Sequence, residues 1–181
     1  MKDLSMHILD IVRNSVEADA KDIFVSMKID AGDLLITCIE DNGRGMSPDM
    51  VKNVTDPFVT TRTTRKVGMG LSLIKMNAEL TGGSLSIESE QGKGTKVSVT
   101  FNLSHIDCLP FGDLGSVFAM LLGGNPGHKF VFDFFANDDE FSIYSDEIWV
   151  MMKETGISQL KMMKLLKEMI NNNLKEMNFY S

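Results

Sequence analysis

The chain has 181 residues, of which 43% are hydrophobic and 24% are charged, with only four prolines. This composition is that of an ordinary globular protein, and it excludes disordered, collagen-like and disulfide-scaffold classes. The length predicts one domain with an addition, or two small domains. Because the net charge is −7, a general nucleic-acid-binding surface is disfavoured, and we expect no nucleic-acid partner.

Cysteine usage predicts a reducing compartment, and hydropathy predicts a protein without a membrane span. Cys38 and Cys108 have neither the spacing of a zinc site nor that of a stapled secreted fold, so we expect two reduced, buried thiols. The N-terminus has no charged start followed by a long apolar run, and no stretch approaches the roughly 20 apolar residues of a membrane span. A cytoplasmic protein without a membrane span is therefore predicted.

The first elements predicted along the chain are a helix and a hairpin. Residues 4–19 place an apolar stripe on one side at helical spacing, formed by Leu4, Ile8, Ile11, Val12 and Ser15. Two β-like runs follow at residues 23–29 and 34–40, joined by a polar turn at residues 30–33. The second run leads directly into a glycine-rich segment at residues 41–45.

A long loop and a second hairpin complete the first unit. Residues 56–70 are rich in Thr, Arg and Gly and lack apolar periodicity, which predicts a functional loop before a helix at residues 71–80. Two alternating runs at residues 84–89 and 96–102 then predict paired strands. We expect the first unit to span residues 1–104.

The pattern restarts after Pro110. It predicts a short helix, two strands and a final amphipathic helix, at residues 113–122, 130–135, 140–144 and 158–177. Residues 105–181 contain six basic and eleven acidic residues, against twelve and fourteen in residues 1–104. We predict a separate C-terminal α+β unit at residues 105–181 that recognises a protein partner or forms a homodimer. It shows no catalytic constellation.

Asp10 and Asn14 are the first candidate site residues. They are four residues apart on the predicted helix, so both side chains project from one stripe. The amide oxygen of Asn14 is a hard ligand, which suits a magnesium ion that completes its shell with phosphates and waters. The alternative interpretation is a solvated polar face.

The segment from Asp41 to Met46 is the second candidate. Asp41 stands at a strand end, where its carboxylate can accept a hydrogen bond from an exocyclic amine and so select adenine. Gly43 and Gly45 allow the backbone to approach a ligand closely. The alternative is an ordinary Asn-Gly hairpin turn.

A third candidate lies at the end of the long loop. Gly68-Met69-Gly70 opens a helix, where free backbone amides and the helix dipole favour a bound phosphate. Arg62, Arg65 and Lys66 precede it, as expected for a phosphate lid. A plain helix cap is the alternative.

These motifs occur in a fixed order along the chain: Asp10-x3-Asn14, Asp41-x-Gly43-x-Gly45, Asp56-Pro57-Phe58 and Gly68-x-Gly70. In that order they resemble the N, G1, F and G2 boxes of the GHKL family of gyrase, Hsp90, histidine kinases and MutL. The resemblance covers about residues 1–104. It is most like a histidine-kinase catalytic domain, and the short lid also resembles anti-sigma-factor serine kinases. It implies a Bergerat-type two-layer α/β sandwich, here with a small C-terminal α+β appendage.

The resemblance also implies ATP and Mg²⁺ as cofactors. It places Asn14 on the metal, Asp41 on the adenine amino group, and Asp10 at the position of the hydrolytic base, where gyrase and MutL carry a glutamate. The further nucleotide contacts that it implies are Gly43, Gly45, Met46, Phe58, Thr60, Thr61, Arg62, Gly68, Met69, Gly70, Leu71 and Thr95.

The predicted function is that of an ATP-binding protein that phosphorylates a partner protein, or controls one through Mg-ATP-dependent lid closure. It would be an ATPase or protein kinase of the GHKL type. Two alternatives stay open: an ATP-hydrolysing accessory subunit for another enzyme, such as a hydrogenase system, and a non-catalytic ATP-gated binding module. Only 13 residues precede Asn14, so we expect no upstream dimerisation domain with a phosphoacceptor histidine. We interpret His7 as a neighbour of the site or a residue of the polar face of the helix.

Overall fold

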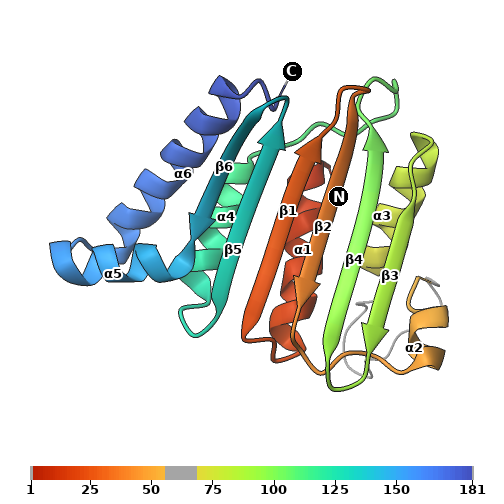
Figure 1. The fold of residues 1–181 in the computed structure, drawn as a ribbon, viewed down its shortest axis with the longest axis horizontal. Coiled ribbons are helices and arrows are strands. Elements are labelled where there is room, and N and C mark those ends of the chain that lie inside the picture. Colours follow the sequence, from red (N-terminus) through yellow and green to blue (C-terminus); the bar gives the residue numbers. More distant parts are fainter. Residues whose placement is uncertain (1, 56–68, 181) are drawn as a thin grey trace.

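The computed structural model describes residues 2–55 and 69–180. Six strands form one mixed sheet in the order β3-β4-β2-β1-β5-β6 (Figure 1). The strands are β1 (Asp22–Ile29), β2 (Leu34–Asp41), β3 (Leu85–Glu90), β4 (Gly94–Asn102), β5 (Lys129–Ala136) and β6 (Asp139–Tyr144).

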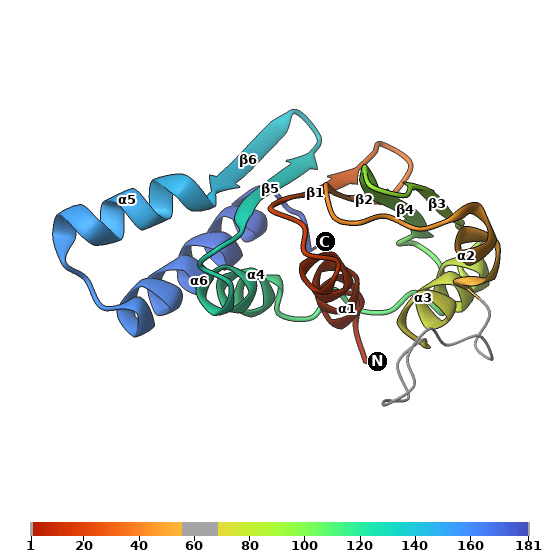
Figure 2. The ribbon, with the colours of Figure 1, turned by 90° about the horizontal axis from the view of Figure 1, so that it is seen from below.

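Helices cover one face of this sheet. The helices in the described ranges are α1 (Leu4–Glu17), α2 (Pro48–Asn53), α3 (Met69–Leu80), α4 (Leu114–Gly124), α5 (Ser145–Thr155) and α6 (Gln159–Glu176). Figure 2 shows α1, α3, α4 and α6 on the same side of the strands, whereas α5 projects beyond β6. The predicted α/β sandwich is therefore confirmed. No helix in the described ranges is long and apolar enough to span a membrane.

Helix α1 buries the stripe that its periodicity predicts. Its N-cap is Asp3, whose side chain accepts a hydrogen bond from the backbone N–H of Met6 at 3.0 Å. Every member of the predicted stripe is buried, with no more than 3% of its surface exposed. The apolar face of α1 thus packs under the middle of the sheet.

The sheet continues into the C-terminal part of the chain. β1 pairs with β5 in parallel over eight residues, from Asp22 opposite Lys129 to Ile29 opposite Ala136. β5 also supplies fully buried aromatic side chains to the core that α1 shares, among them Phe130, Phe132 and Phe134. The predicted boundary near residue 104 stays a prediction, and strands from both sides of it share one sheet and one core.

Two helices were not predicted from the sequence, although their caps are visible in it. α2 begins after Ser47, whose side chain accepts from the N–H of Met50, and it buries no side chain. α5 has acidic residues in its first turn and ends at Gly156, which adopts a left-handed backbone with φ +65°. α2 is only six residues long, too short to show apolar periodicity, whereas α5 was missed although Ile148, Trp149 and Met152 lie on its core side at helical spacing.

Both cysteines are free, but the prediction that they are buried is wrong, because each is only half-buried. Cys38 lies between Thr37 and Ile39, which are buried beneath the helices. Since side chains alternate along a strand, Cys38 faces the uncovered side of the sheet. Burial raises the pKa of the Cys108 thiol.

Candidate functional site

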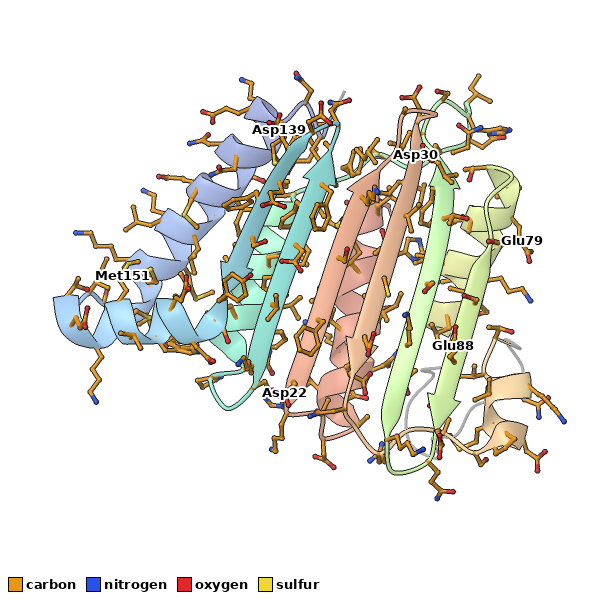
Figure 3. The ribbon with its side chains drawn as sticks, viewed as in Figure 1. Asp22, Asp30, Glu79, Glu88, Asp139 and Met151 are labelled. Atoms are coloured by element: carbon orange, nitrogen blue, oxygen red, sulfur yellow. The ribbon has the colours of Figure 1, made fainter. Side chains whose placement is uncertain are left out.

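Five of the candidate residues gather at one end of the sheet: Asp41, Gly43, Gly45, Met46 and Thr95. Here β1 begins, β2 ends and β4 begins, and Asp41 lies opposite both Ile23 and Thr95 in the register. Figure 3 labels Asp22 at this end, while Asp30 and Asp139 mark the opposite end. The fold therefore brings together three segments that are far apart in the sequence.

Asp41 is a buried carboxylate held by two hydrogen bonds. Only 8% of its surface is exposed. Its Oδ2 accepts from the hydroxyl of Ser15 at 2.7 Å, and its Oδ1 accepts from the N–H of Gly43 at 2.9 Å. An ionised carboxylate offers about four acceptor positions, so this group can still accept from a ligand. Ser15 was expected only on the buried face of α1, and no sequence signal pointed to this bond.

Two glycines allow the loop after Asp41 to pack closely against its neighbours. A Cβ on Gly43 would lie 2.8 Å from the carbonyl oxygen of Ala18 and 2.9 Å from Asp41 Oδ1. Gly45 has φ +63°, and a Cβ there would overlap the carbonyl group of Glu90. Because no side chain fits at either position, the loop after β2 can lie directly against its neighbours.

Side chains from the β3–β4 hairpin fix the same loop. The hydroxyl of Ser89 accepts from the N–H of Met46 at 2.8 Å and donates to the carbonyl oxygen of Gly94 at 2.9 Å. Its Oγ also lies 2.8 Å from Thr95 Oγ1. The structure thus brings Met46 and Thr95 to the Asp41 end of the sheet. The sequence analysis did not identify Ser89. It is a polar residue at one of the half-buried positions of β3, and the alternation of the strand gives no sign of its contacts.

Asn42 ties this loop to the start of β1. Its side-chain oxygen accepts from the backbone N–H of Lys21 at 2.7 Å and from that of Asp22 at 2.9 Å. The carbonyl oxygen of Lys21 in turn accepts from the N–H of Lys129, the first residue of β5, at 2.7 Å. Asn42 was expected only as a turn residue, and the structure makes it a bridge between strands.

Asp10 and Gly70 meet where α1 passes the beginning of α3. A Cβ on Gly70 would lie 3.2 Å from Asp10 Oδ2, so the carboxylate rests against the first turn of α3. Asn14 is exposed one turn further along α1, and Leu71 packs against the core. Within the described ranges, no hydrogen bond to a side-chain atom of Asp10 or Asn14 is present. Both groups are therefore available to a ligand.

Several candidate residues fall outside the described ranges. They are Phe58, Thr60, Thr61, Arg62, Arg65, Lys66 and Gly68. The backbone of Met69 begins α3, two residues earlier than predicted. The loop and lid that the sequence predicts at residues 56–68 thus stay predictions.

The residues present fit a magnesium ion bound mainly through phosphates and waters. Across residues 2–55 and 69–180, no group of three or more His, Cys, Asp and Glu side chains could hold a metal. Magnesium retains several waters and needs only one or two protein oxygens beside phosphate oxygens. Asn14, with Asp10 one turn away, offers such a sparse set of oxygen ligands.

His7 is buried between α1 and α3, one turn before Asp10. Only 1% of its surface is exposed, and its Nε2 lies 2.8 Å from the Asn77 side-chain nitrogen. Among the described residues its Nδ1 has no hydrogen-bond partner. Burial lowers the pKa of the imidazole to about 4. His7 is therefore neutral at pH 7, and its burial contradicts the interpretation as a residue of the polar face, while its place beside the site stays a prediction.

This buried histidine should make stability fall in weakly acidic solution. As the pH drops below 6.5, the unfolded chain binds a proton at His7 that the folded protein excludes until about pH 4. We expect His7 to lower the free energy of unfolding by about 2 kcal/mol between pH 7 and pH 5. Urea unfolding of the wild type and His7→Gln at both pH values measures this contribution. An identical pH dependence in the two proteins would contradict it.

Comparison with known proteins defines the family to which this fold belongs. The sequence pattern of the histidine kinase-, DNA gyrase B- and HSP90-like ATPases matches residues 2–105, more than half of the chain. The chain belongs to this family. The resemblance predicted from the four motifs is thereby confirmed.

Individual relatives match the same part of the chain. Sporulation kinase E of Bacillus subtilis is 34% identical over 99 residues, which are 54% of this chain and 13% of that kinase. Sporulation kinase D of the same organism is 34% identical over 98 residues, 54% of this chain and 19% of that kinase. The matched region is thus less than a fifth of either kinase.

A solved structure supports the fold beyond the family match. The N-terminal domain of a DNA repair protein superimposes on 80% of this chain and 52% of its own, with a TM-score of 0.54 and 17% identity. At this identity the likeness concerns the fold alone. It nevertheless extends over more of the chain than residues 2–105.

Proposed function

We propose that this protein binds Mg-ATP at the Asp41 end of its sheet and uses it to phosphorylate a partner protein or to regulate one conformationally. Membership of the ATPase family supports ATP binding. The observation that carries the proposal is the buried Asp41 carboxylate, which is fixed by Ser15 and Gly43 yet retains acceptor capacity. A buried acceptor of this kind favours a ligand that donates, as the adenine amino group does.

The remaining groups suit the rest of a nucleotide. The first turn of α3, at Gly70, presents backbone N–H groups that favour phosphates. Asn14 would hold the magnesium ion, which neutralises phosphate charge when bound. Asp10, against that first turn, lies where it can accept a proton from an attacking water or hydroxyl. The predicted lid would cover the phosphates from residues 56–68.

Replacing Asp41 with asparagine should weaken ATP binding by about 1.5–3 kcal/mol, the contribution of a hydrogen bond to a charged group. The amide can still accept from Ser15, so the fold should persist, but it loses the charge that strengthens the bond to adenine. Isothermal titration with Mg-ATP measures the difference. Asp139→Asn, at the opposite end of the sheet, is the matched control. Unchanged affinity in a folded Asp41→Asn protein would remove Asp41 as the adenine acceptor.

One experiment separates the activities open to this site. The native protein is purified with whatever binds it and incubated with ATP labelled at the γ-phosphate. Label on a partner protein supports phosphoryl transfer, and released phosphate supports an ATPase that serves another enzyme. Intact ATP that stays bound, with no transfer or release, supports an ATP-gated binding module and contradicts a kinase.

A further inference from the structure

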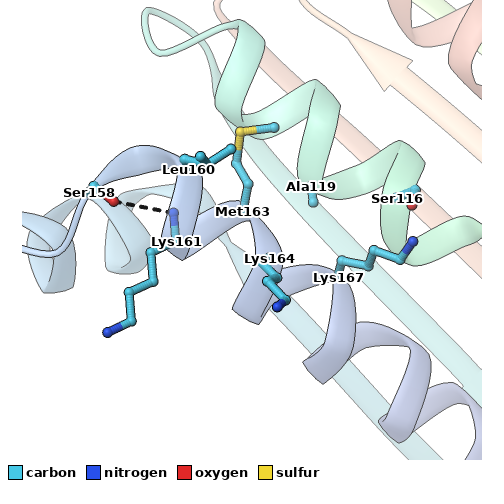
Figure 4. A pocket seen from close by; sticks show the side chains of 8 residues that line it. All are labelled: Ser116, Ala119, Ser158, Leu160, Lys161, Met163, Lys164 and Lys167. Carbon is cyan, nitrogen blue, oxygen red and sulfur yellow. Dashed lines mark hydrogen bonds between the residues drawn. The ribbon is translucent and has the colours of Figure 1, made fainter.

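Helices α4 and α6 border an open groove. These helices belong to the part of the chain that contains β5 and β6, whereas Asp41 and Thr95 of the candidate nucleotide site lie on β2 and β4. The volume of the groove is about 600 Å³, and Figure 4 shows the side chains that line it. Its apolar lining includes Ala119 of α4 and two residues of α6, Leu160 and Met163. Three lysines of α6 also line it: Lys161, Lys164 and Lys167.

Small residues on α4 and a polar cluster fix the walls of this groove. A Cβ on Gly115 would lie 2.6 Å from the carbonyl oxygen of Lys167, so the two helices approach closely there. At the same end, Asp113 accepts from Lys167 Nζ at 2.7 Å and from Asn171 Nδ2 at 3.0 Å. These contacts hold α4 and α6 together beside the groove.

The charge in the groove is opposite to that of the surrounding chain. Residues 105–181 contain six basic residues, and three of them line this one groove. Lys167 is paired with Asp113, whereas neither Lys161 nor Lys164 forms an ion pair with a residue in the described ranges. Leu160, which also lines the groove, is 81% exposed. The groove therefore combines unpaired positive charge with an uncovered apolar side chain.

We propose that this groove binds a short acidic segment of a partner protein. Carboxylates of the segment would face Lys161 and Lys164, and an apolar side chain would cover Leu160 and Met163. The lining from Ser158 to Lys167 extends about 14 Å at 1.5 Å per helical residue. Four or five extended residues span that length. The groove is concave, which favours a short peptide over the flat surface of an anionic membrane.

This surface adds partner recognition to the proposed function and needs no nucleotide, so it can be tested without ATP. The probe is an acetylated octapeptide of six glutamates and two leucines, titrated into the ¹⁵N-labelled full-length protein. We expect backbone amide shifts confined to residues 116–119 and 158–167, with a dissociation constant of about 1 mM or below. Raising NaCl from about 50 to 500 mM should weaken binding about fivefold or more.

Charge reversal in the groove provides the decisive comparison. The double variant Lys161→Glu/Lys164→Glu should bind the peptide about tenfold more weakly or worse. Lys153→Glu/Lys175→Glu makes the same change of net charge on α5 and at the end of α6, and should bind nearly as the wild type does. Equal weakening of both double variants would overturn the proposal, since net charge alone would then explain it.

A second peptide keeps the test valid even if the groove variant fails to fold. A peptide with lysine in place of every glutamate should cause no shifts, and equal binding of both peptides would overturn the proposal. The proposal would also be overturned if the glutamate peptide caused no shifts at a concentration of about 5 mM. If the protein binds phosphatidylglycerol vesicles and Lys161→Glu/Lys164→Glu abolishes this binding, the proposal is overturned in favour of a membrane. If sedimentation shows that the protein self-associates and the same variant abolishes the association, the proposal is overturned in favour of a second copy of the chain.

Discussion

The variant Asp10→Asn is expected to release phosphate from ATP about 10²–10⁴-fold more slowly than the wild type, with nearly unchanged ATP affinity. Asparagine preserves the size of the side chain and its contact with the first turn of α3 at Gly70. It cannot accept a proton at neutral pH. Single-turnover hydrolysis measures the rate, and titration with Mg-ATP measures the affinity.

The longer variant Asp10→Glu is the matched comparison. It retains the carboxylate and gives it the reach of the glutamate in gyrase-like relatives, so hydrolysis should be kept or raised. Both variants need to be assayed with and without the co-purifying partner, because phosphoryl transfer can use a nucleophile of the partner. Equal rates for the wild type and Asp10→Asn in both assays would remove Asp10 from the mechanism.

The variant Asn14→Ala is expected to lose Mg-dependent ATP binding and to keep its fold. Asn14 is exposed on α1, so its truncation leaves no buried group without a partner, while the metal would lose one of its few protein ligands. At 100-fold excess over its Kd, Mg-ATP should stabilise the wild type by about 2.7 kcal/mol. Thermal unfolding with and without Mg-ATP measures this gain.

Asn172→Ala is the control for this experiment, because Asn172 is likewise an exposed helical asparagine but lies on α6. It should show the full stabilisation by Mg-ATP. The same gain in Asn14→Ala would contradict the metal role. ATP without magnesium should affect the wild type and Asn14→Ala alike, which separates loss of the metal from general damage to the site.

Local pattern was enough to predict most elements. The apolar stripe from Leu4 to Ser15 marked α1, and alternation around the turn at residues 30–33 marked β1 and β2. Such periodicity reflects which side of an element is buried, and neighbouring residues carry that information. The missed α2 buries no side chain, so its sequence carries little of this information, whereas α5 was missed although its apolar residues follow helical spacing.

Contacts between distant segments could not be predicted from local pattern. The motifs identified Asp41 and Asp10, but the bond from Ser15 to Asp41 and the approach of Gly70 to Asp10 depend on how α1 packs on the sheet and on α3. The parallel pairing of β1 with β5 joins residues more than 100 positions apart. Nothing in either strand specifies its neighbour, since both have similar apolar runs.

The parallel pairing of β1 with β5 has a practical consequence for anyone who shortens this protein. A fragment that stops at residue 105, where the family match ends, would leave all eight residues of β1 as a bare edge. Unpaired edges of that length recruit strands from other molecules and lead to aggregation. Lys21 would also lose its bond from Lys129 while still held by Asn42. Biochemical work on ATP binding is therefore best done with the strands after residue 128 in place.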